Sequence, residues 1–242
     1  MFELSMQTLA IAFVIVCLGA ILQTLSGFGM ALLAAPVLVL IDSEFLPAPI
    51  LTLGFVLSLF NATRLRAHLD IAPIGYALVT RAIGSVLAIG LLSIMPIDWL
   101  ITGFAVLIIA TVALTVKTVN IQYSRRNMMI AGFLSGVIGT TTSIGGPPVA
   151  MVLQNSPLQQ ARAQLSLFFL ISTFMSLILL SATGNFSAHQ LELTVFLLPA
   201  LVVGFVCANA MSARFKPQYF KPVINIVSVM ASLFLLAKTW VI

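Results

Sequence analysis

Two short stretches, Ser26-Gly27-Phe28-Gly29 and Ser143-Ile144-Gly145-Gly146, interrupt apolar runs with small residues. When the chain is shifted by 117 positions the two stretches coincide, and five of eleven neighbouring positions are identical. The identical pairs are Gly19/Gly136, Ile21/Ile138, Thr24/Thr141, Ser26/Ser143 and Gly29/Gly146. We name these stretches the first break and the second break. Their likeness predicts a chain built from two related halves.

The composition predicts a membrane protein. Of the 242 residues, 61% are hydrophobic and 7% are charged, and the mean hydropathy is +1.18. Soluble domains carry about 25% charged residues, so this chain lacks the polar groups to cover a water-facing surface. No polar block is long enough to form a soluble domain. We therefore expect an all-α polytopic membrane protein with a single transmembrane domain over residues 1–242.

Ten apolar segments follow one another along the chain. They cover 4–25, 30–41, 46–63, 71–94, 97–116, 128–142, 147–154, 163–183, 190–213 and 222–241. A full helical span needs about 20 residues, and the three shortest segments, which flank the breaks, fall short of that. A glycine-rich break cannot face lipid, because its backbone groups would lack partners, but protein or water can surround it. We expect about eight full spans and two broken or re-entrant hairpins.

The charges predict how the segments are oriented. Nine of the eleven cations fall in connections that we place in the cytoplasm, namely Arg64, Arg66, Lys117, Arg125, Arg126, Arg162, Arg214, Lys216 and Lys221. The remaining connections hold Glu3, Asp42, Glu44, Asp98 and Glu192 and no Lys or Arg. By the positive-inside rule both termini are external. The basic balance is thus a topology signal, and nucleic acid is not an expected partner.

Each predicted half contains five segments, an odd number, so the second half is inverted relative to the first. We expect inverted pseudo-repeats over 1–117 and 128–242, joined by a cytoplasmic loop at 118–127. Gln159, Gln160 and Arg162 are expected in a cytoplasmic turn before the segment 163–183. Inverted repeats with paired, interrupted helices are typical of secondary transporters, whose substrates bind near the interruptions.

A helix is expected to start directly after each break. A helix N-terminus presents free N–H groups and about half a positive charge, so two of them meeting near the midplane would suit an anion. The candidate substrate-binding residues at the breaks are Gln23, Thr24, Ser26, Gly27, Gly29, Thr141, Thr142, Ser143, Gly145 and Gly146. The alternative is that these small residues only allow helices to pack closely, as they commonly do in membranes.

Arg81 is the other candidate. It lies near the centre of the segment 71–94, where burying a cation costs at least about 2.5–3.5 kcal/mol. No Asp or Glu lies at a similar depth in the sequence. We expect Arg81 to hold the negative charge of a substrate. The alternative is that it caps the last carbonyl groups of a broken helix.

The sequence shows no nucleophile–base pair, metal-ligand cluster or nucleotide-binding motif. We therefore expect no catalytic residue, no metal and no cofactor, and we do not expect an enzyme. The expected partners are a small anion and the lipid bilayer, and no oligomeric state is specified.

The two breaks and their surroundings resemble the sulfite exporter TauE/SafE family. The resemblance rests on Gly19, the first break and Pro36, and on the second-half run from Gly132 through the second break to Pro147-Pro148. Phe28 stands where a third glycine is common in the family. The resemblance implies a bacterial inner-membrane permease, often an exporter, for sulfite, organosulfonates or related anions. An anion channel and a membrane-embedded enzyme or assembly subunit remain the alternatives.

Overall fold

The computed structural model describes residues 6–116, 121–212 and 221–240, with only part of the side chains in the helices at 97–116 and 221–240. Over these residues the chain is helical, at 84% helix, and contains no strand. Five of the described helical stretches are long and apolar enough to cross a bilayer: Met6–Ser26, Ser43–Arg64, Gly75–Ile94, Leu158–Ala182 and Ala188–Met211. The protein is thus a multi-pass helical membrane protein, as the composition predicts.

The helices follow the apolar segments closely. The first half contains α1 (Met6–Ser26), α2 (Met30–Ile41), the 3₁₀ turn η1 (Ser43–Phe45), α3 (Ala48–Arg64), the 3₁₀ turn η2 (Arg66–His68), α4 (Gly75–Ile94) and α5 (Ile97–Val116). The second half contains α6 (Arg125–Thr142), α7 (Gly146–Leu153), α8 (Leu158–Ala182), α9 (Ala188–Met211) and α10 (Lys221–Trp240). The short helices α2 and α7, of 12 and 8 residues, follow the two breaks.

Two helices begin earlier than their apolar segments predict. Helix α6 starts at Arg125 and not at 128, and α8 starts at Leu158 and not at 163. Gln and Arg are good helix formers, so a polar first turn extends a helix that hydropathy alone would shorten. Gln159, Gln160 and Arg162 consequently lie on a helix, and their predicted place in a turn is wrong.

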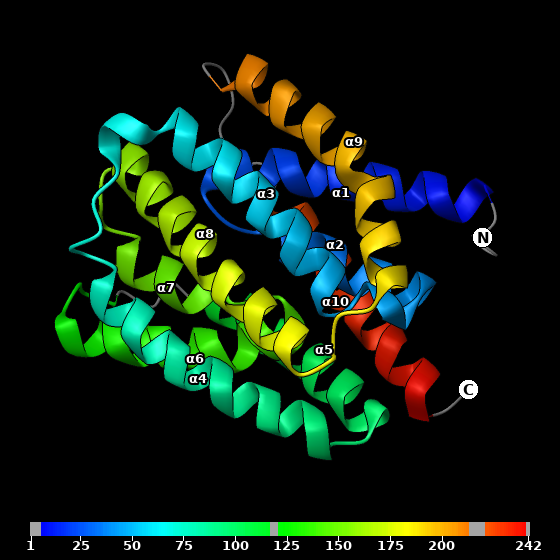
Figure 1. Ribbon diagram of the computed structural model, residues 1–242. Coiled ribbons are helices and arrows are strands. Elements are labelled where there is room, and N and C mark those ends of the chain that lie inside the picture. The colour runs from blue at the N-terminus through cyan, green and yellow to red at the C-terminus, as the bar shows by residue number, and fades with distance from the viewer. Residues whose placement is uncertain (1–5, 117–120, 213–220, 241–242) are drawn as a thin grey trace.

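The helices pack in pairs around a central pair. Helices α3 and α8 run side by side through the middle of the molecule, with α4 along α6 on one side and α1 along α9 on the other (Figure 1). Helix α5 packs against α10. Glycines allow the two flanking pairs to approach closely. A Cβ added at Gly136 would lie 3.0 Å from the Gly84 Cα, and one at Gly204 would lie 2.8 Å from the Ala20 Cβ.

Large apolar side chains cover the outside of the pairs as well as the inside. Val79, Ile83 and Val86 on α4 are exposed, as are Val202 and Val206 on α9. In water such faces would be unfavourable, whereas in a bilayer they contact lipid tails.

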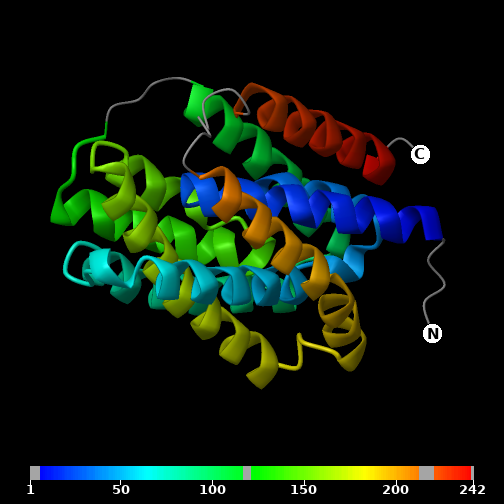
Figure 2. The ribbon, with the colours of Figure 1, turned by 90° about the horizontal axis from the view of Figure 1, so that it is seen from above.

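The connections gather at two opposite ends of the helix bundle. The start of α1 and the end of α10 lie at the same end, together with η1 (Figures 1 and 2). The connection through η2 and the starts of α6 and α8 lie at the opposite end (Figure 2). We name this opposite end the arginine end, because its described elements carry Arg64, Arg66 and Arg125. Lys117, Arg214, Lys216 and Glu3 lie outside the described residues. Which end faces the cytoplasm stays a prediction.

Candidate functional site

The two breaks meet at one cavity of about 40 Å³, although they are 117 residues apart in the chain. It is lined by Gln23, Phe28, Gly29, Met30, Ala31, Leu32, Ile50, Leu51, Gly54, Ser143, Ile144, Gly146, Pro147, Phe169 and Thr173. Helices α3 and α8 supply the walls between the breaks. The structure therefore brings four predicted site residues, Gln23, Gly29, Ser143 and Gly146, to a common space.

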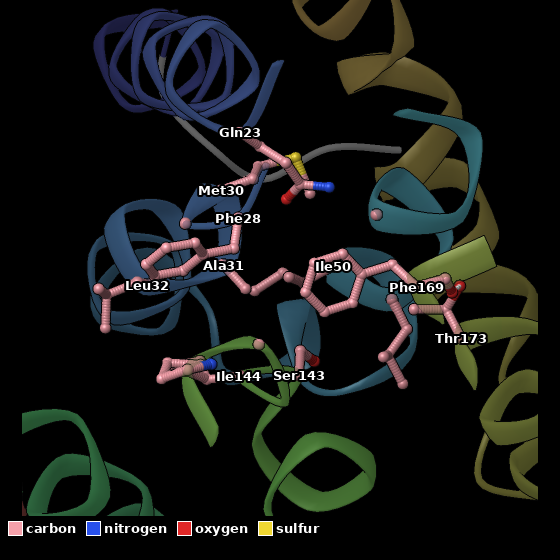
Figure 3. Close-up of a pocket in the computed structure, with 15 residues that line it drawn as sticks. Gln23, Phe28, Met30, Ala31, Leu32, Ile50, Ser143, Ile144, Phe169 and Thr173 are labelled. Carbon is pink, nitrogen blue, oxygen red and sulfur yellow. Dashed lines mark hydrogen bonds between the residues drawn. The ribbon is translucent and has the colours of Figure 1, made fainter. Parts of the chain in front are cut away.

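The cavity wall is mostly apolar and carries few polar side chains. Phe28 and Phe169 enter from different sides, and Ser143 and Gln23 lie at opposite borders (Figure 3). The Gln23 Nε2 donates to Ser58 Oγ at 3.4 Å. The Thr173 hydroxyl, which the sequence did not single out, donates to the Phe169 carbonyl at 2.6 Å. The polar side chains of the wall are thus engaged with the protein in this conformation.

The first break is a glycine turn between α1 and α2. Gly27 and Gly29 have φ values of 92° and 117°, a left-handed region that glycine adopts without a steric cost. The Ser26 hydroxyl lies 2.7 Å from the Leu22 carbonyl and 2.6 Å from the Phe28 carbonyl, so it closes the end of α1. Gly29 precedes α2 without a side-chain cap. The first-turn N–H groups of α2 therefore have no partner within their own helix.

The second break is built differently. Its left-handed residue is Ser143, with φ 63°, a region that costs a residue with a side chain about 1–2 kcal/mol. The Ser143 hydroxyl donates to the Pro47 carbonyl at 2.8 Å. Helix α7 then begins with Pro147 and Pro148 in its first turn. Proline has no N–H, so this helix start offers fewer main-chain donors than that of α2.

The predicted threonine hydroxyl groups do not line the cavity. Thr141 and Thr142 donate back into their own helix, at 2.9 Å to the Val137 carbonyl and 2.7 Å to the Ile138 carbonyl. Thr24 is buried, and its hydroxyl accepts a hydrogen bond from Asn61 Nδ2 at 3.3 Å. These threonines support the breaks from behind and do not line the cavity.

Arg81 lies behind the second break. It is 1% exposed, and its Nη1 donates to the Ser135 carbonyl and, at 2.6 Å, to the Ser135 hydroxyl. Its Nη2 lies 3.4 Å from the Ser176 hydroxyl, and its guanidinium carbon lies 5.5 Å from the Phe168 ring centroid. The Ser135 hydroxyl in turn donates to the Gly145 carbonyl. Ser135 lies in the interior of α6, so Arg81 does not cap the last carbonyl groups of a helix, and it does not line the cavity either. Substrate contact by Arg81 stays a prediction.

Arg162 is a buried cation that the sequence did not place at the site. Only 6% of it is exposed, and its Nη2 donates to the Thr24 carbonyl at 2.9 Å. Because Thr24 is 138 residues away in the chain, no local signal reveals the contact. The helical spacing from Arg162 to Phe169 and Thr173 would have revealed the shared face, had the start of α8 been predicted correctly.

Among the described residues, no group of three or more His, Cys, Asp or Glu side chains is placed to hold a metal ion. The site therefore consists of two helix starts and a mainly apolar wall, with one buried arginine beside each break.

Comparison with curated proteins and with solved structures gives no match. Comparison with protein families matches residues 11–235 to the family described as sulfite exporter TauE/SafE. The match covers nearly the whole chain and includes both breaks, so it confirms the resemblance found in the sequence. The chain belongs to the sulfite exporter TauE/SafE family.

Proposed function

We propose that the protein is a secondary transporter that exports a small sulfur-containing anion, such as sulfite or an organosulfonate, by alternating access. The family is one of membrane exporters of such anions and not of enzymes. The single observation that carries the proposal is the cavity that both breaks share. The two interrupted segments supply one common place where a substrate can bind.

The first-turn backbone of α2 is the strongest anion-binding element of this proposed site. Met30, Ala31 and Leu32 line the cavity, and their N–H groups lack intrahelical acceptors. The N-terminus of α2 adds about half a positive charge. At the second break Gly146 adds one N–H group. Gln23 and Ser143 can turn from their present acceptors toward a bound oxyanion.

The remaining predicted residues act from behind the cavity wall. In our proposal they hold the two breaks in shape and add positive potential without touching the substrate in this conformation. They are Thr24, Ser26, Gly27, Arg81, Thr141, Thr142 and Gly145.

The size of the cavity favours a compact anion. A buried water needs at least about 10–15 Å³ on this measure, so about 40 Å³ holds a few waters or a group of similar size. Sulfite, with four heavy atoms, is of that scale. An organosulfonate with a carbon chain requires Phe28 and Phe169 to move apart. We therefore place sulfite ahead of larger sulfonates.

The helix packing supports a chain of two inverted five-segment repeats, 1–117 and 128–242. If α1 corresponds to α6 and α4 to α9, the pair α1–α9 has its counterpart in α6–α4. The pairs α3–α8 and α5–α10 then join equivalent helices. A two-fold axis in the membrane plane gives this pattern. In the proposal the protein lies in the bacterial inner membrane with both termini external, and the repeats alternate about the cavity.

The proposal is tested by the flux of labelled sulfite and sulfoacetate into proteoliposomes. Wild type is compared with Gly146→Ala, because a Cβ there would lie 2.9 Å from Phe169 Cζ and 3.3 Å from Phe28 Cβ. The added methyl group fills part of the cavity, so sulfite flux falls. Gly90→Ala is the matched control, since a Cβ at Gly90 meets nothing within 4 Å, and its flux stays at the wild-type level.

The alternatives give different results in the same vesicles. A channel passes sulfite without saturation and carries a steady current, whereas a transporter saturates. An enzyme consumes the anion without moving it. If wild type moves no sulfur oxyanion under any gradient, the transporter proposal is overturned.

A further inference from the structure

Arg162 shares a face of α8 with the cavity residues of that helix. Phe169 and Thr173, which line the cavity, follow Arg162 by seven and eleven residues. Such separations return to the same side of an α-helix. At 1.5 Å per residue, Arg162 lies about 10 Å from Phe169 along the helix axis. It is therefore placed on the cavity side of α8, about two turns nearer the arginine end.

The Arg162 side chain lies directly against the first break. A Cβ added at Gly27 would lie 3.3 Å from the Arg162 Cα and 3.4 Å from its Cγ. Its Nη2 donates to the Thr24 carbonyl at 2.9 Å. Because α1 ends at Ser26, this carbonyl is one of the last four of the helix, which have no intrahelical partner. Arg162, which is distant from α1 in the sequence, thus caps the negative C-terminal end of that helix.

The guanidinium of Arg162 is not fully used by the protein. Its Nε is buried and has no hydrogen-bond partner, and the same holds for the Nε of Arg81 and for the side-chain oxygen atoms of Asn61, Gln164 and Asn209. Asn61 also contacts Thr24, through its Nδ2 at 3.3 Å from the threonine Oγ1. A buried polar atom without a partner is costly and calls for an unseen group. For an arginine, that group is most simply an oxyanion held by Nε and one Nη together.

Other positive charges surround this position at the arginine end. Arg64, which ends α3, is exposed and lies within electrostatic range of Arg162. Arg66 is exposed in η2, and η2 packs against α8. His68 and Asp70 are also exposed there, and the Asp70 carboxylate accepts a hydrogen bond from the Ala72 N–H at 2.9 Å. The arginines attract anions to this end of the molecule and raise their local concentration.

We propose that Arg162 is a second binding station for the transported oxyanion, between the arginine end and the cavity. The inference rests on the proposed transport function and adds a residue to its path. The anion binds the Nε and one Nη of Arg162 and replaces the Thr24 carbonyl as acceptor. A charged acceptor makes the stronger hydrogen bond with a guanidinium, so the exchange is favourable. Since Thr24 lies in the first half and Arg162 in the second, capture of the anion also releases a contact between the halves.

The test compares Arg162→Gln and Arg162→Lys with Arg126→Gln, an exposed arginine of the same end. Equilibrium binding of labelled sulfite is measured on detergent-purified protein, and KM and Vmax are measured in proteoliposomes. Arg162→Gln is expected to raise the Kd and the KM for sulfite at least about tenfold, or about 1.4 kcal/mol. Arg162→Lys keeps the positive charge but loses the planar, bidentate donor group of arginine. Its Kd and KM for sulfite are therefore expected to lie between those of Arg162→Gln and wild type. Arg126→Gln matches wild type.

Several outcomes overturn the inference. One is a wild-type Kd and KM in Arg162→Gln. Another is a fall in Vmax with KM unchanged in both Arg162 variants, because that result marks a purely structural contact. If Arg162→Gln does not fold, Arg162→Lys decides, since a lysine still reaches the Thr24 carbonyl as a donor. If wild type neither binds nor moves sulfite, the transport proposal itself is overturned. This result differs from those that overturn only the role of Arg162.

Discussion

The first and second breaks match in sequence but are held by the protein in different ways. Arg162 supports the first through a single hydrogen bond to Thr24. Arg81 supports the second through the Ser135 carbonyl, two serine hydroxyl groups and the face of Phe168. The repeated residues thus place two turns at matching positions, whereas the surrounding helices decide how firmly each turn is anchored. We infer that the second break is the fixed side of the cavity and the first break the adjustable side.

The largest expected effect is the loss of Arg81. Arg81→Gln removes several charge-assisted hydrogen bonds, each contributing about 1.5–3 kcal/mol, whereas Arg162→Gln removes one. The melting temperature of the purified protein in detergent therefore falls much further for Arg81→Gln. Equal losses would contradict the contrast between the breaks. A stable Arg81→Gln protein that no longer binds sulfite would instead support direct substrate contact by Arg81.

The next effect concerns the close helix pairs. A Cβ at Gly84 would overlap the Phe133 carbonyl of α6, and one at Gly204 would overlap the Cys17 carbonyl of α1. Backbone atoms cannot move aside as a flexible side chain can, so Gly84→Ala and Gly204→Ala each destabilise by about 1–3 kcal/mol or more. Gly90→Ala in the same helix as Gly84 is the control. Thermal denaturation measures the stability of all three variants. If only one of Gly84→Ala and Gly204→Ala is destabilised, the α4–α6 and α1–α9 pairs are not equivalent.

The smallest effect has opposite signs at the two breaks. Ser143 has a left-handed backbone, so Ser143→Gly is more stable than Ser143→Ala by about 1 kcal/mol. Ser26 still belongs to α1, so Ser26→Gly is less stable than Ser26→Ala, by up to about 1 kcal/mol. The Gly and Ala variants at each position both lack the serine hydroxyl group, so the difference between them does not include its loss. The same sign at both positions, measured by denaturation in detergent, would show that the two turns do not differ as described.

Local signals in the sequence predicted the breaks and the helices that follow them. Helix α2 occupies 30–41 as predicted, and α7 starts one residue before its predicted run. Glycine and proline act on the backbone at their own positions, so a single sequence shows their effect directly. The composition likewise predicted a helical membrane protein, because apolar content acts over the whole chain.

The support of the breaks could not be predicted in the same way. Arg81 meets Ser135 only because α4 packs along α6, and Arg162 meets Thr24 only because α8 crosses the end of α1. These contacts depend on the packing of helices that are distant in sequence. Hydropathy also misled the prediction at Arg162, since a charged first turn resembles a loop when only polarity is counted. The positions of the predicted cavity residues depend on the same packing, which is why only part of that set lines the cavity.

The pairing of α1 with α9 has a consequence for the biosynthesis of the chain. The Cys17 carbonyl of α1 packs against Gly204 of α9. At about 5–20 residues per second, the synthesis of these two residues is separated by roughly 10–40 s. Arg81 and Ser135, by contrast, are only 54 residues apart, so α4 and α6 can pair early. Among the described helices, α1 is therefore made first but is among the last to acquire its full set of neighbours. A chain that is cut short before α9 leaves α1 without this partner, and Arg162 of α8 then supplies its long-range contact at Thr24.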